Sequence, residues 1–312
     1  MITLNYPDIP VEKKLVAATG FFDGVHIGHQ TVLRNIVSKA KEQNKKSCIV
    51  TFWPHPRIVL SKDAESLRLL TTIDEKRKII STLGIDYFYL IPFTQKFSQL
   101  SPKQFFENIL INTIDISQLY VGYNHRFGRN ARAGFDETMK LGKKFDIDIF
   151  KIDAVSCDNE KISSTGIRQL LETGDIENAN SMLGYNYGLQ GVVVHGNQIG
   201  RTLGFPTANI QPNAYKMLPK NGVYAATVKI KNSEYCGMLN IGLRPTLNNT
   251  EKSVIEVNIF DFDEDIYDIT ISVQLVKRIR DEHPFASLDI LKEQLKQDAL
   301  GIRKIFNRNY IE

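Results

Sequence analysis

The sequence has few features of an exported, metal-binding or membrane-spanning chain. Its three cysteines, Cys48, Cys157 and Cys236, are odd in number, widely spaced and not arranged as metal-ligand pairs. The longest apolar runs, such as Ile85–Phe93, are too short to cross a bilayer. The N-terminus lacks a basic segment followed by an apolar stretch. We therefore expect a cytoplasmic protein with no membrane partner, whose cysteines are small buried thiols in a reducing compartment.

A large excess of charge of one sign is also absent. The 39 Lys and Arg residues against 35 Asp and Glu leave a net charge of +4. Residues 1–185 carry +3 and residues 186–312 carry +1, so the basic residues do not gather in either half. Nucleic-acid modules usually show a stronger bias, and we expect no nucleic-acid partner. The length of 312 residues favours two domains that bind small anionic ligands.

Short β-rich runs alternate with longer segments of helical period from Lys14 to about Phe150. This βαβ pattern predicts an α/β domain with a parallel sheet that is covered on both faces. Such sheets bind ligands at the carboxyl ends of their strands. The expected strands are LVAAT, SCIVTF, IDYFYLI and QLYVG, and the expected helices are His29–Gln43, Ile73–Leu83 and Pro102–Ile111.

After Tyr185 the pattern changes to alternating apolar and polar residues separated by turn pairs, which predicts a small antiparallel barrel or sandwich. A terminal helix is expected at Ser287–Ala299, with Ser287 as its N-cap. We place the domain boundary near Gly184–Gly188. The expected strands are Leu189–Val194, Val223–Ile230, Glu234–Ile241, Val254–Asp261 and Ile269–Val276.

The segment Gly20–His29, GFFDGVHIGH, runs from a strand into a helix. Gly24 and Gly28 allow close approach of the backbone to phosphate, and a helix start offers unpaired N–H groups and a positive dipole end. His26 and His29 are three residues apart, so both imidazoles can point the same way on one helical turn. A single histidine near a strand end is more often a turn or core residue, but the whole segment predicts an ATP site.

This segment resembles the HxGH signature of the nucleotidylyltransferase superfamily. Three further segments follow it: Thr51–Pro56 (TFWPHP), Val121–Gly128 (VGYNHRFG) and Ser163–Arg168 (SSTGIR). Taken alone, PHP could be a rigid turn and SSTGIR a helix cap. In this order the segments resemble the adenylyltransferase module of the bacterial bifunctional riboflavin kinase and FAD synthetase family. The resemblance extends through both domains.

The second half resembles the riboflavin kinase domain of the same family, first in GVVVHGNQIGRTLGFPTANI and then in PKNGVY, NIGLRPT and VIEVNIFDF. The resemblance implies a Rossmann-like nucleotidylyltransferase domain at residues 1–185 and a kinase-like antiparallel β-barrel with a terminal helix at residues 186–312. Thr207 and Asn209 are hard-oxygen groups placed to ligate Mg²⁺ together with ATP. A capped turn after Pro206 is the alternative interpretation.

Glu256 lies inside the apolar run Val254–Phe262. A carboxylate there is costly unless it is used or paired, and burial would raise its pKa toward that of a useful base. The resemblance implies that Glu256 takes the proton from the ribityl 5′-hydroxyl, whereas a glutamate that simply faces solvent is the alternative. Arg280 and Phe285 match positions near the flavin, with a salt bridge and core packing as equal alternatives.

The resemblance implies two reactions: phosphorylation of riboflavin by ATP to FMN and ADP, and attack of the FMN phosphate on the α-phosphorus of ATP to give FAD and pyrophosphate. ATP and Mg²⁺ serve both, and riboflavin, FMN and FAD are substrates and products. We expect no other partner beyond, at most, a weak homo-oligomer. Many family members have Asp-Phe where this chain has Asn124-His125, so the local charge is less negative here.

The resemblance also assigns residues to four groups. The catalytic group is Glu256, His26, His29 and Arg168. The ATP- and phosphate-binding group is Gly20, Phe22, Asp23, Gly24, Gly28, Ser163, Ser164, Thr165, Gly196, Gly200, Arg201, Gly204 and Pro206. The flavin-binding group is Pro54, His55, Pro56, Asn124, Arg126, Arg280 and Phe285, and the metal group is Thr207, Asn209 and Asn124.

Two other functions share part of this pattern: a class I aminoacyl-tRNA synthetase and a flavin-binding regulatory protein. The tetrapeptide His26–His29 reads HIGH, which also marks class I aminoacyl-tRNA synthetases. However, there is no KMSKS-like loop, SSTGIR stands where that loop is expected, and the second half has no basic bias. A flavin-binding regulatory protein that has lost its activity would show decay of the catalytic set, whereas Thr207, Asn209 and Glu256 are all present alongside both histidines.

Overall fold

The structure is a computed structural model that describes residues 1–61, 67–122, 134–152, 156–157, 160–196, 199–245 and 251–308. The chain divides into two compact units, residues 1–164 and residues 165–312. This division separates packing units rather than functional domains. The domain boundary expected near residues 184–188 therefore stays a prediction.

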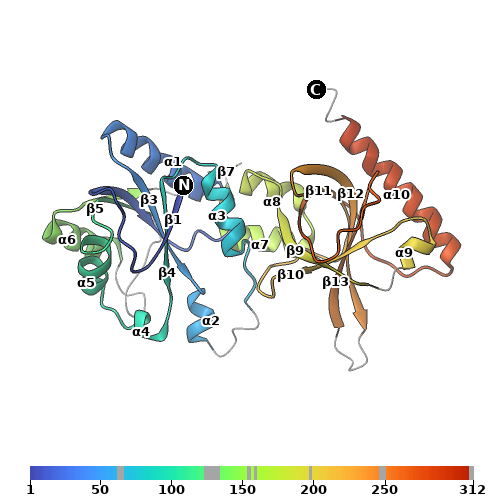
Figure 1. Cartoon of the computed structure of the whole chain (residues 1–312), viewed down its shortest axis with the longest axis horizontal. Coiled ribbons are helices and arrows are strands. Elements are labelled where there is room, and N and C mark those ends of the chain that lie inside the picture. Colours follow the sequence, from blue (N-terminus) through green and yellow to red (C-terminus); the bar gives the residue numbers. More distant parts are fainter. Residues whose placement is uncertain are drawn as a thin grey trace. The chain divides into compact units, whose positions relative to one another are not determined.

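The first unit is built on a six-stranded sheet in which every pair of neighbouring strands is parallel. Across the sheet the order is β1-β4-β3-β2-β5-β6 (Figure 1). The expected parallel α/β fold is confirmed. The strands are β1 (Ile2–Asn5), β2 (Leu15–Thr19), β3 (Ser47–Trp53), β4 (Tyr87–Pro92), β5 (Ile116–Gly122) and β6 (Asp148–Ile152).

The strand order reverses at β2, which has β3 on one side and β5 on the other. Connections leave the sheet in opposite directions at such a point, and the crevice between them is where open α/β sheets bind their ligands. The segment Gly20–His26 follows β2 and leads into α1 (Ile27–Glu42). The fold therefore places this loop at the position best suited to a ligand.

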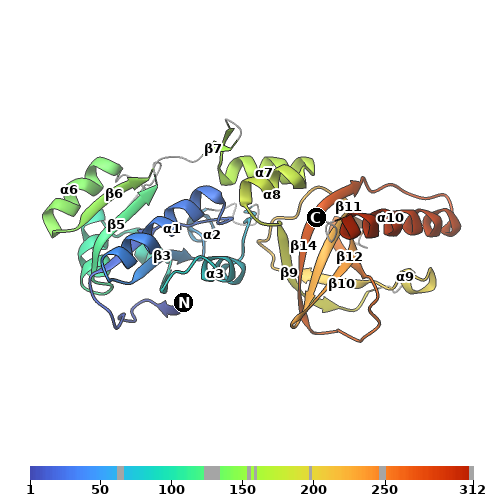
Figure 2. The same cartoon turned by 90° about the horizontal axis from the view of Figure 1, so that it is seen from above.

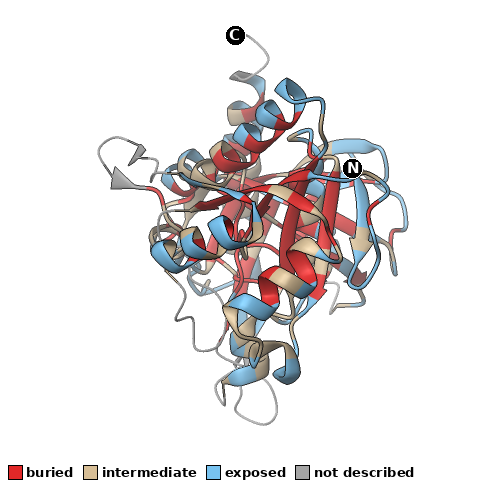
Figure 3. Ribbon diagram, turned by 90° about the vertical axis from the view of Figure 1, so that its left-hand side faces the viewer, coloured by how far each residue is buried: buried red, intermediate tan, exposed pale blue. Residues whose placement is uncertain are grey.

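Helices cover both faces of this sheet. One face packs against α1 and α3 (Ile73–Ser81), and the other packs against a π-helix (Phe105–Ile111) and α6 (Phe135–Phe145). All five residues of β2 are buried, as the red strands of Figure 3 illustrate, so its sequence is continuously apolar rather than alternating. The remaining elements are the short helices α2 (Pro56–Leu60), α4 (Gln95–Ser98) and α5 (Pro102–Gln104) and the hairpin β7 (Ser156–Cys157) and β8 (Glu160–Lys161).

The helix predicted at Pro102–Ile111 is helical throughout, but only its first turn is an α-helix. The rest is the π-helix, which has a wider turn and is usually limited to a single bulge. The apolar pattern predicts the buried face but not this widening, because the same residues reach the core in both forms. The buried side chains of the π-helix are Phe105, Phe106, Ile109 and Leu110.

The sequence pattern does not predict the two edge strands β1 and β6. Their residues are exposed or half-buried, so they lack the apolar run that marks the central strands. Each is held by backbone pairing to one neighbour, β4 for β1 and β5 for β6. Edge strands depend on such a neighbour, which a pattern read along the chain does not reveal.

The second unit begins with two helices, α7 (Ser164–Thr173) and α8 (Ile176–Leu183). The carboxylate of Asp175 caps α8 by accepting a hydrogen bond from the backbone N–H of Asn178, and Gly184 ends the helix in the left-handed conformation at φ +75°. The sequence pattern predicts α7 through SSTGIR but does not predict α8.

The barrel expected in the second half is present and closed, with the strand order β10-β13-β12-β11-β14-β9 and antiparallel pairing all round (Figure 2). A sandwich is therefore excluded. The elements are β9 (Gly188–Val194), α9 (Ile199–Thr202), β10 (Ala208–Pro212), β11 (Gly222–Ile230), β12 (Ser233–Pro245), β13 (Glu251–Ile259), β14 (Thr270–Arg280) and α10 (Leu288–Arg308).

The terminal helix α10 packs on the outside of the barrel, where Ile302 and Phe306 contact the outward-facing residues Val223 and Met238. As expected, Ser287 caps it, with its hydroxyl accepting from the N–H of Ile290. The helix continues beyond the expected end because its apolar stripe continues. Within the described ranges, no helix is long and apolar enough to span a bilayer.

The packing of α10 predicts different costs for the same substitution at two of its isoleucines. Ile302 is fully buried and Ile290 is 54 % exposed. We expect Ile302→Ala to lower the free energy of unfolding by about 2–5 kcal/mol. The matched control Ile290→Ala should change it by no more than about 0.5 kcal/mol. Urea denaturation followed by circular dichroism checks this, and equal midpoints for the two variants would contradict the packing.

Candidate functional site

The loop between β2 and α1 has an unusual backbone. Phe22 and Val25 have φ values of +49° and +38°, which side chains with a Cβ rarely adopt, and Gly24 lies at +81°. A Cβ on Gly20 would lie 3.1 Å from the ring of Phe22. Such a backbone persists only where its surroundings hold it. This loop therefore depends on specific contacts.

Asp23 supplies several of these contacts. Its buried carboxylate accepts hydrogen bonds from the backbone N–H groups of Leu70 (3.2 Å) and Thr71 (3.1 Å). The Thr71 hydroxyl in turn accepts from the N–H of Gly24 at 3.1 Å. The carboxylate thus ties the loop to the segment that precedes α3. Its expected role toward ATP stays a prediction.

His26 and His29 stand together as the sequence predicts. Their rings are stacked, with centroids 3.7 Å apart and an angle of 17° between the planes, and the edge of Phe22 meets His29. His26 is the N-cap of α1, and its Nδ1 accepts from the N–H of His29 at 3.4 Å. The buried Nδ1 of His29 has no hydrogen-bond partner within the described part of the chain.

Both imidazoles are neutral near pH 7. Burial lowers the pKa of His26 to about 4, and the nearby carboxylate of Asp23 opposes that shift only partly. Burial, with further contributions from His26 and Lys76, holds the pKa of His29 well below its usual range. Because Nδ1 of His26 accepts a hydrogen bond, its proton lies on Nε2. A neutral Nε2–H is a suitable donor to a phosphate oxygen.

Sequence reasoning missed Lys76. Its side chain is almost fully buried, and its Nζ donates to the backbone carbonyl of Phe21 in the same loop at 2.5 Å. Burial lowers the pKa of Lys76 to about 8, although Asp23 favours the charged form. The only signal in the sequence is its place in a helix that begins with the capping pair Thr72 and Glu75. Nothing in that pattern indicates that the side chain points under the loop.

The next strand, β3, ends in the expected flavin-binding segment. His55 caps α2 by accepting from the N–H of Arg57 at 3.3 Å, and Pro56 is the first residue of that helix. The ring of His55 lies 5.0 Å from that of Phe21, so this segment borders the loop after β2. Pro54 precedes both. The flavin-binding assignment of Pro54, His55 and Pro56 stays a prediction, and Asn124 and Arg126 lie outside the described residues.

Ser164 connects the SSTGIR motif to the loop. Its hydroxyl donates to the backbone carbonyl of Asp23 at 2.9 Å, and Ser163 beside it is half-buried. Thr165, which is exposed, and Arg168, which is half-buried, follow on α7 and belong to the second packing unit. The phosphate roles of these residues stay predictions.

In the barrel, residues from three strands form one polar row. Asn209 on β10 pairs directly with Glu256 on β13, which pairs with Asn240 on β12. Directly paired residues point to the same face of a sheet. The neighbours Ile255 and Val257 are buried in the barrel interior, so the row faces outward. The structure thus brings together the expected base and an expected metal ligand, which are far apart in the sequence.

Two of the glycines expected to bind phosphate in this unit, Gly196 and Gly200, pack closely against other residues of the chain. A Cβ on Gly196 would overlap the side-chain amide of Asn209, and one on Gly200 would overlap the carbonyl oxygen of Phe205 and lie 3.4 Å from Thr207. Glycine at these two positions therefore permits the packing that places Asn209 and Thr207. Gly204 has φ +84° with open space around it.

A pocket of about 680 Å³ lies beside these residues. Its floor includes Gly204 and Pro206, and the backbone carbonyl of Pro206 accepts from the Asn258 amide at 2.7 Å. Arg303 lies 4.6 Å over the ring of Phe260 at one wall. Aromatic side chains beside the exposed Gly204 suit a planar base with phosphates attached. Arg201 lies exposed on α9, outside the pocket lining.

Arg280, expected near the flavin, forms a salt bridge with Asp298 of α10, with Nε and Nη2 at 2.9 and 2.8 Å from the carboxylate. Asp298 is only 4 % exposed, so this pair is tightly held. The guanidinium also lies 5.6 Å from the ring centroid of Phe285. The salt bridge that the sequence left open is therefore present, and the flavin role stays a prediction.

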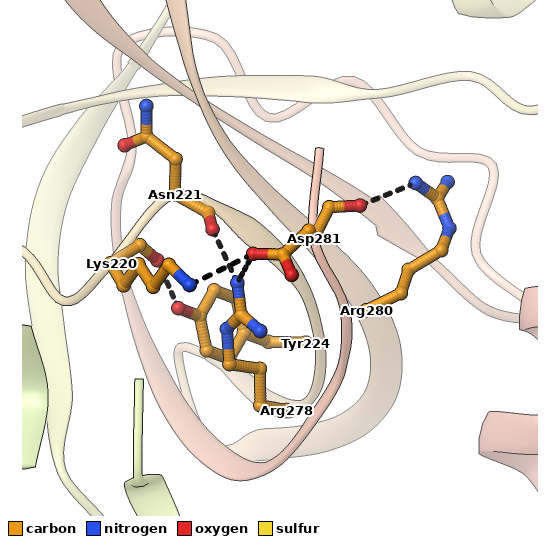
Figure 4. Close-up of polar contacts among 6 residues, drawn as sticks. All are labelled: Lys220, Asn221, Tyr224, Arg278, Arg280 and Asp281. Carbon is orange, nitrogen blue, oxygen red and sulfur yellow. Dashed lines mark hydrogen bonds and ion pairs between the residues drawn. The ribbon is translucent and has the colours of Figure 1, made fainter. Parts of the chain in front are cut away.

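A second arginine on β14 anchors the adjoining turn (Figure 4). Arg278 donates to the carbonyl of Asn221 and to the carboxylate of Asp281, both at 2.7 Å, and Asp281 also pairs with Lys220 at 3.1 Å. The hydroxyl of Tyr224 donates to the carbonyl of Lys220. These contacts fix the end of β14, and so the start of the segment that carries Phe285.

The hard-oxygen side chains of Thr207 and Asn209 fit Mg²⁺, which takes few protein ligands and completes its coordination with substrate phosphates and water. Among the described residues, no group of three or more His, Cys, Asp or Glu side chains forms a metal site. A cation held mainly through ATP is consistent with such a donor set. Thr207 directly precedes β10, and Asn209 is the second residue of that strand.

A loop with two stacked histidines at the switch point of a parallel sheet, in a chain that also carries a closed barrel, is typical of the class of nucleotide-dependent transferases. Comparison with known families agrees. The FAD synthetase family matches residues 8–166, and the riboflavin kinase family matches residues 183–306.

Relatives match almost the whole chain. Proteins described as bifunctional riboflavin kinase/FMN adenylyltransferase are 37 % identical in Bacillus subtilis and 35 % identical in Escherichia coli, and each match covers 95 % of this chain and 94 % of the relative. A crystal structure described as a macrolide-efflux protein from Streptococcus pneumoniae has a TM-score of 0.88 at 32 % identity and covers 97 % of this chain and 99 % of its own. This chain belongs to the bifunctional riboflavin kinase/FMN adenylyltransferase family.

The pKa of His26 predicts how stability depends on pH. Between about 6.5 and about 4 the unfolded chain binds a proton that the folded chain excludes, so stability should fall as the pH drops through this window. His26→Asn keeps a capping oxygen but does not titrate, and it should weaken this dependence. Urea unfolding followed by the fluorescence of Trp53, the only tryptophan, measures it. An unchanged slope in the variant would contradict the assignment.

The position of Gly196 predicts a loss of kinase activity on substitution. In Gly196→Ala the new Cβ displaces Asn209, and a misplaced ligand should lower kcat/KM for riboflavin phosphorylation by about 100-fold. Gly301→Ala on α10, where a Cβ meets nothing within 4 Å, is the control and should retain full activity. Both variants should still adenylylate added FMN. Full kinase activity in Gly196→Ala would refute the proposed close approach.

Proposed function

We propose that residues 1–185 form the FMN adenylyltransferase domain and residues 186–312 the riboflavin kinase domain of an enzyme that makes FMN and then FAD. Membership of the family and the presence of both of its domains support both activities. The assignment of the two sites rests on two clusters of motif residues that lie close together. In the first unit, His26 and His29 stack after β2, and on the barrel, Asn209 pairs directly with Glu256.

In the kinase site, Glu256 takes the proton from the 5′-hydroxyl of the ribityl chain as that oxygen attacks the γ-phosphorus of ATP, and ADP leaves. Asn209, directly opposite Glu256, and Thr207 would hold Mg²⁺ together with the ATP phosphates, whose charge the bound cation would neutralise. The pocket next to Gly204 and Pro206 takes the adenine, which places the phosphates along the turn before β10.

In the adenylyltransferase site, a phosphate oxygen of FMN attacks the α-phosphorus of ATP and pyrophosphate leaves, with no covalent enzyme intermediate. His26 and His29 act as neutral hydrogen-bond donors to the ATP phosphates, aided by the N-terminus of α1. Arg168 supplies a permanent planar cation and Ser164 a hydroxyl. Catalysis rests on positioning and on stabilising charge at the reacting oxygens.

We also infer that the enzyme works in the cytoplasm. Both proposed reactions consume ATP with Mg²⁺. Cys48 is a free thiol buried in the core, and burial raises its pKa, so it stays protonated and unreactive. Free thiols are typical of reducing compartments. Fractionation of the native cells with detection of the protein tests this inference.

The two sites should be separable by mutation. With riboflavin, ATP and Mg²⁺, His29→Ala should stop at FMN, because loss of a transition-state donor lowers adenylylation by about 100-fold or more. Glu256→Gln should lower riboflavin phosphorylation by about 100- to 10,000-fold but spare the conversion of added FMN. Chromatographic separation of riboflavin, FMN and FAD measures both.

Each of these variants serves as the folding control for the other, since each should keep one activity. If the wild-type protein forms neither FMN nor FAD, from oxidised or reduced flavin, the proposed function is wrong. Loss of both activities in either single variant would refute two independent sites.

A further inference from the structure

The loop of residues 20–26, here called the nucleotide loop, is held by residues 70–76 of the first unit. The proposed mechanism does not use this supporting segment. Residues 70–76 form hydrogen bonds with three residues of the loop, on both sides of Phe22. The backbone N–H groups of Leu70 and Thr71 donate to Asp23, the Thr71 hydroxyl accepts from Gly24, and Lys76 donates to the carbonyl of Phe21. These contacts surround Phe22, whose φ of +49° needs external support.

Leu70, Thr71 and Lys76 together form a clamp on this loop. Lys76 differs from the other two because its side chain is charged. It is 6 % exposed, and a buried ammonium is costly unless it is paired or used. Its Nζ donates to the neutral carbonyl of Phe21, while the Asp23 carboxylate, which attracts it, is already bonded to two backbone N–H groups. The position of this cation is therefore better explained by its effect on the neighbouring site than by a local ion pair.

The groups that act on the charge of His29 are few and of known sign. Burial disfavours a positive charge on the ring most strongly, and His26, stacked on it at 3.7 Å, and Lys76 of α3 add to this effect. Asp23 favours the charged forms of His26 and Lys76. Protonation of the stacked pair would also remove Nδ1 of His26 as the acceptor that starts α1.

We propose that Lys76 is a positioning residue of the adenylyltransferase site: through the Phe21 carbonyl it holds the loop that carries His26 and His29, and it places a buried positive charge against that loop. This proposal rests on the proposed function of the first unit. It separates two roles, a hydrogen bond that a neutral donor can replace and a charge that it cannot.

The test compares four variants with the wild-type protein. Lys76→Met removes the bond and the charge, and Lys76→Gln keeps a donor but no charge. Thr71→Val removes an uncharged bond of the same clamp. Lys78→Met removes an exposed charge from the same helix and is the matched control. Riboflavin phosphorylation by each variant, which the second unit performs, reports that the chain is folded.

Two measurements are made on each: the pH profile of FAD formation from FMN and ATP, and the NMR titration of the His29 ring, assigned with a His29→Gln spectrum among the six histidines. Loss of the Lys76 charge should move the His29 titration and the acid limb of the profile upward by about one pH unit in both Lys76 variants. In Lys76→Met, kcat should also fall about tenfold or more. Thr71→Val should lower kcat without moving either titration, and Lys78→Met should match the wild type.

The proposal is overturned if either Lys76 variant loses activity while the His29 titration and the acid limb of the pH profile stay unchanged. Lys76 would then be a structural residue, like Thr71. Unchanged activity and titration in both would overturn it too. If Lys76→Met fails to fold, the same shift is required of Lys76→Gln. A wild-type protein that forms no FAD would refute the proposed function instead, while the NMR titration would still decide whether the charge of Lys76 acts on His29.

Discussion

The hydrogen bonds between the Asp23 carboxylate and the backbone of Leu70 and Thr71 are the constraint on which the first site depends. They hold a loop whose positive φ values are unfavourable for Phe22 and Val25. The bond from Ser164 to the carbonyl of Asp23 adds a third segment to the same point. Because that loop follows β2, at the switch point of the sheet, its conformation sets where α1 begins and where both histidines stand.

The electrostatics of this site follow from its burial. A triphosphate would be expected to meet cations, yet the two histidines are neutral because a desolvated imidazole does not hold a proton near pH 7. They can contribute hydrogen bonds without a competing charge between their stacked rings. Within the first unit, Lys76 beneath the loop contributes a positive charge instead. Separating directional donors from cations in this way suits a reaction in which a negatively charged nucleophile must approach a negatively charged substrate.

In the barrel, the pairing register of the strands positions the site residues, as the Asp23 hydrogen bonds do in the first unit. Asn209 and Glu256 meet because β10 and β13 pair in one register, and a slip of one residue would turn either side chain into the apolar interior. The close approach of Gly196 to the Asn209 amide further restricts that side chain. The salt bridge between Arg280 and Asp298 and the contacts of Arg278 then hold the end of β14 against α10 and the start of β11. Closure of the barrel pairs its first strand, β9, with its last, β14.

The sequence by itself determined the fold class, the motifs of both domains and the pairing of His26 with His29. Helical and strand periods and short motifs depend only on residues that are close together in the chain. The sequence did not reveal the edge strands or helix α8, since these depend on the neighbouring segments. The strand pattern alone left a barrel and a sandwich open, and the family resemblance correctly implied the barrel. Only the tertiary structure decided that Asp23 supports the loop, that Arg280 is paired, and that Lys76 lies buried beneath Phe21. Each of these contacts joins residues between 18 and 55 positions apart, and no local pattern encodes which buried polar groups will meet across such a distance.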